Sequence, residues 1–165
     1  MTSKKLTRTA VCVTVAVLLG YIESLFPPIV PVPGIKIGLA NMIIIVLLYS
    51  ESAKSAWTVS VMKVILTSVL FGTATTFLYS LCGAVLSLSV MCIAKKTRVF
   101  STVGVSSLGG IFHNFGQLIC AYFFIGKGAV LYMPVLCLTG AVCGVLTGLA
   151  AQLIIKRGRN LFGKE

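Results

Sequence analysis

Acidic residues are scarce in this sequence: its 165 residues include three glutamates, Glu23, Glu51 and Glu165, and no aspartate. Histidine occurs once, as His113. Chemistry that depends on clustered carboxylates is therefore excluded, including an Asp-rich magnesium-diphosphate site, a carboxylate dyad and a calcium loop. No nucleophile stands beside a base in a recognisable motif, so we expect no enzymatic activity from this chain alone.

Paired cysteines are also lacking. The six cysteines stand singly inside apolar segments, without a C-x-x-C pair or a neighbouring metal ligand. We interpret them as small packing residues. The sequence predicts neither a bound metal nor a cofactor.

Apolar residues dominate what is present, since 58% of the chain is hydrophobic, 10% is charged and the mean hydropathy is +1.06. This composition is typical of membrane proteins. A spanning helix needs about 20 residues, which leaves room for about six spans. We predict an all-α polytopic membrane protein in which residues 1–165 form a single integral membrane domain, a compact bundle of six transmembrane helices. The predicted spans cover residues 6–26, 35–49, 53–71, 75–94, 101–125 and 129–155.

Basic residues concentrate at alternate ends of these spans. With a cytoplasmic N-terminus, 11 of the 14 Lys and Arg lie on the inner side, two (Lys36 and Lys127) on the outer side, and Lys63 within a span. This pattern predicts that both termini are cytoplasmic, and it argues against nucleic acid as a partner. The N-terminus is similar to a signal peptide, but no small-x-small cleavage site follows it, so we expect a retained first span.

The second predicted span is unusual because it is short. It follows residues 27–34, a proline-rich stretch that cannot form a regular helix. A short, interrupted apolar segment in a polytopic protein points to a binding site. An ordinary external loop beside a tilted helix is the alternative interpretation.

Small and polar residues recur at spacings of three and four within most spans, which places them on one helix face. Helix packing explains such stripes, and it is our interpretation of Gly140, Gly144 and Gly148. The stripes of the third and fifth spans differ, because each contains an ionisable residue, Lys63 or His113, close to the bilayer midplane.

Lys63 carries the strongest functional signal. A lysine at this depth costs at least ~2.5 kcal/mol on insertion scales, so it should face the bundle interior. One interpretation is a structural contact with the amide oxygen of Asn114 or Gln117. The other, which we favour, is a cationic anchor for an anionic solute in a cavity that His113 and Gln117 also line. His113 itself is either a ligand contact or a buried core residue.

Four further polar residues mark the outer mouth of this predicted cavity, near the ends of the first two spans: Tyr21, Glu23, Lys36 and Asn41. Asn41 lies about 7 Å from Lys36 along the second span. Alternatively, Glu23 and Lys36 pair with each other at the interface. The full set of predicted ligand-binding residues is Lys63, His113, Gln117, Asn41, Lys36, Asn114, Glu23 and Tyr21.

Three segments carry a resemblance to a known family. They are E-S-L-F-P-P-I-V-P-V-P-G-I-K-I-G-L-A-N (residues 23–41), F-L-Y-S-L-C-G-A-V-L-S-L-S-V-M (residues 77–91) and H-N-F-G-Q-L (residues 113–118). Over nearly its whole length the chain resembles the small bacterial membrane family named Gx transporter, also labelled heptaprenyl diphosphate synthase component I.

The resemblance implies a six-helix subunit similar to the substrate-binding S components of energy-coupling factor transporters. Those components bind vitamin-like solutes between their helices and an outer lid loop, and they associate with a transmembrane coupling subunit and ATPases. By this analogy residues 27–34 form the lid, and Ala16 and Gly20 contact the coupling subunit. The implied location is the bacterial inner membrane, in contact with lipid.

We therefore expect a membrane-embedded, solute-binding subunit for transport of a small anionic, vitamin-like or flavin-like compound, energised by partner subunits. One alternative is an accessory of heptaprenyl diphosphate or quinone synthesis. It would be noncatalytic, because a chain without Asp lacks the motifs that bind magnesium diphosphate. A second alternative is a structural subunit of a membrane complex, in which the polar stripes only pack helices.

Overall fold

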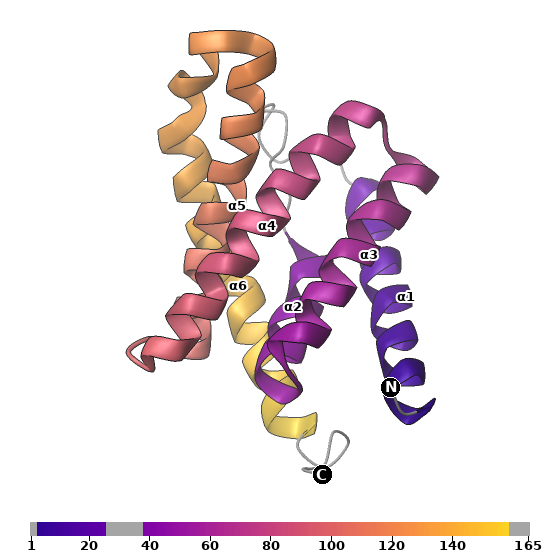
Figure 1. Cartoon of the computed structure of the whole chain (residues 1–165). Helices are drawn as coiled ribbons and strands as arrows, with labels where there is room; N and C mark the ends of the chain where they lie inside the picture. The colour runs from indigo at the N-terminus through magenta and orange to yellow at the C-terminus, as the bar shows by residue number, and fades with distance from the viewer. Residues whose placement is uncertain (1–2, 26–37, 159–165) are drawn as a thin grey trace.

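The computed structural model describes residues 3–25 and 38–158, and within these ranges it contains helices and no strand. The prediction of an all-α fold is confirmed. In chain order (Figure 1), the helices are α1 (Ser3–Leu25), α2 (Leu39–Ser50), α3 (Ala53–Phe71), α4 (Ala74–Thr97), α5 (Thr102–Ile125), the 3-10 helix η1 (Gly126–Tyr132) and α6 (Met133–Gly158).

Hydroxyl caps fix the beginnings of two helices. α3 begins after Ser52, whose Oγ accepts a hydrogen bond from the Ser55 N–H at 3.2 Å. α4 begins after Thr73, which forms a reciprocal capping box with Thr76. Both starts lie within one residue of the predicted starts.

The last α-helix begins four residues after residue 129, the predicted beginning of the last span. Gly126–Tyr132 form η1, and α6 begins at Met133. Pro134 follows directly, and proline is well accommodated in the first turn of a helix, where no N–H donor is needed. The second helix begins at Leu39, and the predicted residues 35–37 of that span lie outside the described ranges.

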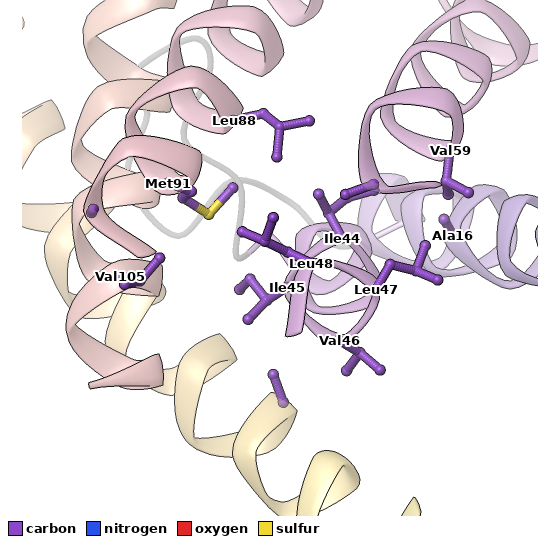
Figure 2. Close-up of a cluster of buried hydrophobic side chains, with 13 residues drawn as sticks. Ala16, Ile44, Ile45, Val46, Leu47, Leu48, Val59, Leu88, Met91 and Val105 are labelled. Carbon is purple, nitrogen blue, oxygen red and sulfur yellow. The ribbon is translucent and has the colours of Figure 1, made fainter. Parts of the chain in front are cut away.

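α2 occupies the centre of the bundle. Its five consecutive residues Ile44 to Leu48 are all buried, which is expected only for a helix that is enclosed on every side. Figure 2 shows these side chains surrounded by Ala16 of α1, Val59 of α3, Leu88 and Met91 of α4, and Val105 of α5. With 12 residues, α2 is about 18 Å long, shorter than the hydrocarbon core of a bilayer.

Charged side chains from two other helices contact the ends of α2. At its beginning, the Glu23 carboxylate of α1 accepts a hydrogen bond from the Gly38 N–H at 2.5 Å. At its other end, the Lys95 ammonium of α4 donates to the Leu48 carbonyl and lies over the Tyr49 ring. A carboxylate at the N-terminus and an ammonium at the C-terminus are the arrangement that the helix dipole favours.

α5 packs directly against α6 through glycines. A Cβ atom added to Gly110 would lie 2.1 Å from the Gly140 carbonyl oxygen, so the two backbones are in contact. The Ser106 hydroxyl donates to the Gly144 carbonyl at 2.6 Å. These contacts agree with the interpretation of the α6 glycines as packing residues.

The outward surfaces of the helices are apolar. Val69, Phe123 and Leu131 are each about 80% exposed, and many other large apolar side chains are exposed around the bundle. Four stretches are long and apolar enough to cross a membrane: Ser3–Leu25, Ala53–Phe71, Ala74–Thr97 and Thr102–Gly158, the last of which includes α5, η1 and α6. Apolar exposure on this scale identifies a membrane protein.

The connections fall at two opposite ends of the molecule. The beginning of α1, the turn between α2 and α3, the turn between α4 and α5, and the end of α6 all lie in the lower part of Figure 1. All described Lys and Arg residues except Lys63 and Lys127 belong to this end. Lys127 lies in η1, at the opposite end.

Candidate functional site

A cavity of about 90 Å³ with several polar lining residues lies inside the bundle, and residues from all six α-helices line it. Six of the eight predicted ligand-binding residues are among its lining residues: Glu23, Asn41, Lys63, His113, Asn114 and Gln117. The remaining lining is made largely of glycines and hydroxyl side chains. Polar groups from distant parts of the sequence therefore meet at one point in an otherwise apolar bundle.

The beginning of α2 forms one wall of this cavity. Gly38 precedes the helix with φ = 83°, a left-handed conformation that glycine adopts without strain. Its carbonyl accepts from the Asn41 N–H at 2.8 Å, while its own N–H donates to Glu23. α2 is short and begins inside the bundle. Its first turn therefore places Asn41 at the cavity.

Lys63 extends from α3 to this first turn of α2. Its Nζ donates a hydrogen bond to Asn41 Oδ1 at 3.0 Å. The sequence led us to expect an amide partner from Asn114 or Gln117, and the structure brings Asn41 to this position. This acceptor is an amide oxygen, which carries no net charge, and the bond orients the ammonium.

His113 of α5 lies against α4, where Gly83 makes room for it. A Cβ atom on Gly83 would lie 2.9 Å from His113 Cε1 and 3.0 Å from Nε2. Any larger residue at position 83 would therefore displace the imidazole. Gly83 thus leaves the space in which His113 lines the cavity.

Asn114 and Gln117, one turn apart on α5, have different surroundings. Asn114 Nδ2 donates to the Leu136 carbonyl of α6 at 2.6 Å, so this amide connects two helices. Gln117 is 6% exposed, and its Oε1 is buried without a hydrogen-bond partner among the described residues. Gln117 therefore has a buried acceptor that no described group uses.

One predicted residue, Tyr21, is described and does not line this cavity. Tyr21 is 39% exposed and stacks against Phe71, with 4.7 Å between the ring centroids, near the C-terminal end of α1. Lys36, its predicted pairing with Glu23 and the predicted lid at residues 27–34 lie outside the described residues.

The sequence analysis missed Gly38 and Thr147, which also line the cavity. Thr147 shares a hydrogen bond of 3.2 Å with Ser106, between α6 and α5. Its position three residues after Gly144 places it on the glycine face of α6, and this spacing was the available signal. Nothing in the sequence around Gly38 indicated its conformation.

The cavity offers hydrogen-bond donors, acceptors and charges of both signs in a confined space. Its ammonium, imidazole and amide groups suit recognition of a small polar molecule. Within residues 3–25 and 38–158, no group of three His, Cys, Asp or Glu side chains is placed to hold a metal ion.

Comparison with known proteins gives one informative result. The comparisons with curated proteins and with solved structures give no match. The family model described as heptaprenyl diphosphate synthase component I matches residues 12–154. This match spans most of the sequence, including every residue that lines the cavity, and the chain therefore belongs to the heptaprenyl diphosphate synthase component I family.

Proposed function

We propose that this protein is a membrane-embedded binding subunit that holds a small anionic solute in the central cavity and works in transport with energising partners. The observation that carries the proposal is the convergence of Lys63, Asn41, His113 and Gln117 on one cavity in an apolar bundle. Burying polar groups inside a membrane bundle is costly, and residues that do so are usually functional.

The charges around the cavity favour an anion. The Glu23 carboxylate accepts from the Gly38 N–H, at the positive end of the α2 dipole, so its charge is partly balanced by the helix. Lys63 is oriented by a neutral amide oxygen. A carboxylate or phosphate group on the solute would add a charge-assisted hydrogen bond to this ammonium.

The volume of the cavity limits the size of the ligand that it can enclose. Sites for drug-sized ligands commonly measure about 300–1,000 Å³, whereas this cavity measures about 90 Å³. A vitamin-like or flavin-like solute would therefore place its anionic group here, with the rest of the molecule outside the described cavity.

The proposed topology has six membrane crossings and two cytoplasmic termini. Its support is the concentration of basic residues at the end of the molecule that contains the beginning of α1 and the end of α6. α2 alone is too short to span the hydrocarbon core, so its crossing would depend on its neighbours.

Energy for transport would come from other subunits. The sequence contains no phosphate-binding glycine loop, so a transmembrane coupling subunit and ATPases are the partners that we propose. The apolar outer surfaces of the helices offer area both for such a subunit and for lipid.

Lys63→Met tests the anion site, because methionine keeps the unbranched apolar stem and removes the charge. The solute is first identified by native mass spectrometry of the gently solubilised protein, and its affinity is then measured by calorimetry. We expect the variant to fold and to bind it about 10 to 100 times more weakly, as a charged hydrogen bond of roughly 1.5–3 kcal/mol implies.

Lys127→Met is the matched control, since Lys127 lies in η1, away from the cavity, and should leave the affinity unchanged. Equal affinities of the wild type and Lys63→Met would remove Lys63 from the site. Helix packing would then be the better explanation of the polar stripes, and the protein would be a structural subunit of a membrane complex.

A second candidate function follows from the family description. A component I implies a partner component, and we consider a noncatalytic accessory of heptaprenyl diphosphate or quinone synthesis. In that case Lys63 would contact a diphosphate, and the prenyl tail would lie along the apolar spans. A prenyl lipid in the native mass spectrum favours this candidate, whereas a flavin or other vitamin-like compound favours transport.

A further inference from the structure

The amide oxygen of Gln117 is a hydrogen-bond acceptor in the cavity that has no role in binding an anion. Its side chain is 6% exposed and lines the cavity, and its Oε1 is buried without a hydrogen-bond partner among the described residues. Native proteins seldom retain a buried amide oxygen without a partner, because its desolvation is uncompensated. This oxygen therefore calls for a donor.

Several hydrogen-bond donors that line the cavity are committed to helix packing. Asn114 Nδ2 donates to the Leu136 carbonyl of α6 at 2.6 Å. The hydroxyls of Ser87 and Ser106 donate to the backbone carbonyls of Gly109 and Gly144, at 2.7 and 2.6 Å. Since these donors hold helices together, the solute is the natural source of the donor that Gln117 lacks.

We propose that Gln117 determines specificity by accepting a hydrogen bond from a hydroxyl or amino group of the solute, an inference that rests on the proposed function. The terminal torsion of a glutamine is broad, so the amide group of Gln117 can rotate to present its oxygen to a ligand. Glu23, which accepts hydrogen bonds and donates none when ionised, lines the same cavity.

The ligand class follows from Lys63 and Gln117 together. Lys63 takes an oxyanion, while Gln117 accepts from a donor. The cavity of about 90 Å³ admits only a small group. The group that it recognises is a carboxylate or phosphate that also carries a hydroxyl or amino substituent, of which a 2-hydroxy carboxylate is the simplest example.

Lactate and propionate form a suitable pair of probes, because they differ in one hydroxyl next to the carboxylate. Calorimetry on the purified full-length protein in detergent measures both affinities for the wild type, Gln117→Met, Lys63→Met and the control Gln152→Met. Gln152 is a partly exposed glutamine of α6 that does not line the cavity.

We expect the wild type and Gln152→Met to bind lactate about tenfold more tightly than propionate, as one additional hydrogen bond implies. Gln117→Met should bind both probes with the affinity that the wild type has for propionate. Its melting temperature should stay equal or rise, because an unsatisfied acceptor is removed.

Equal affinities of the wild type for lactate and propionate would overturn the role of Gln117, and this result does not require any variant to fold. A preference for lactate that survives in Gln117→Met would overturn it as well. In either case, weaker propionate binding by Lys63→Met would still uphold the anion site. Propionate binding unchanged by Lys63→Met would instead refute the proposed function. Absence of binding by both probes would overturn the ligand class.

Discussion

The contact between α5 and α6 makes Gly110→Ala the most direct test of the described packing. The added methyl carbon would lie 2.1 Å from the Gly140 carbonyl oxygen, whereas van der Waals contact begins near 3.4 Å. The obstruction is backbone, which cannot rotate away as a side chain would. The two helices must therefore separate locally by about 1.3 Å, the difference between these distances.

This separation would break the hydrogen bonds that cross the interface. The bonds of 2.6 Å from Asn114 to Leu136 and from Ser106 to Gly144 would lengthen to about 3.9 Å, beyond hydrogen-bond range. Each interhelical bond in a membrane protein contributes about 0.6 kcal/mol, and overpacking costs about 1–3 kcal/mol more. The better helix propensity of alanine returns about 1 kcal/mol. We expect a net loss of about 1–3 kcal/mol.

Unfolding in detergent by titration with sodium dodecyl sulfate, followed by the fluorescence of the single tryptophan, Trp57, measures this loss. Gly128→Ala is the matched control, because a Cβ at Gly128 meets no atom within 4 Å, and its stability should stay within about 0.5 kcal/mol of the wild type. If Gly110→Ala were as stable as Gly128→Ala, the close approach of α5 and α6 would be refuted.

Two further predictions concern topology and activity. Reporter fusions at Lys127 and at the C-terminus should report opposite sides of the membrane, because basic residues gather at the end of the molecule opposite η1; the same side for both would rule out six crossings. The purified protein, given an allylic diphosphate, isopentenyl diphosphate and magnesium, should form no prenyl product, because the sequence has no Asp to hold the metal. Product formation above that of a heat-treated sample would contradict this expectation.

Helix positions were largely predictable from the sequence, because apolar length and capping residues are local signals. Ser52 and Gly72 flank α3, and its observed bounds equal the predicted ones. Hydropathy alone, however, does not separate a 3-10 helix from the α-helix that follows it. The start of α6 was misplaced for this reason, since residues 129–132 are apolar enough to continue the span.

The meeting of Lys63 and His113 at one cavity was expected from their similar positions along the predicted spans, because residue spacing sets the position along a helix. The partner of Lys63 was not, because spacing does not tell which helices are neighbours. Asn41 meets Lys63 only because α2 lies in the middle of the bundle and begins inside it. The contact of Glu23 with Gly38 depends on the same placement.

The central position of α2 has a consequence for biogenesis. A 12-residue apolar helix is too short to span a bilayer by itself, so α2 depends on neighbouring helices for a stable position in the membrane. Glu23, which contacts the beginning of α2, is synthesised before α2. Lys95, which contacts the end of α2, belongs to α4 and is synthesised about 50 residues later. The contact of Lys95 with the end of α2 therefore forms only after α4 has been synthesised, and the cavity, which residues of α5 and α6 also line, is completed late.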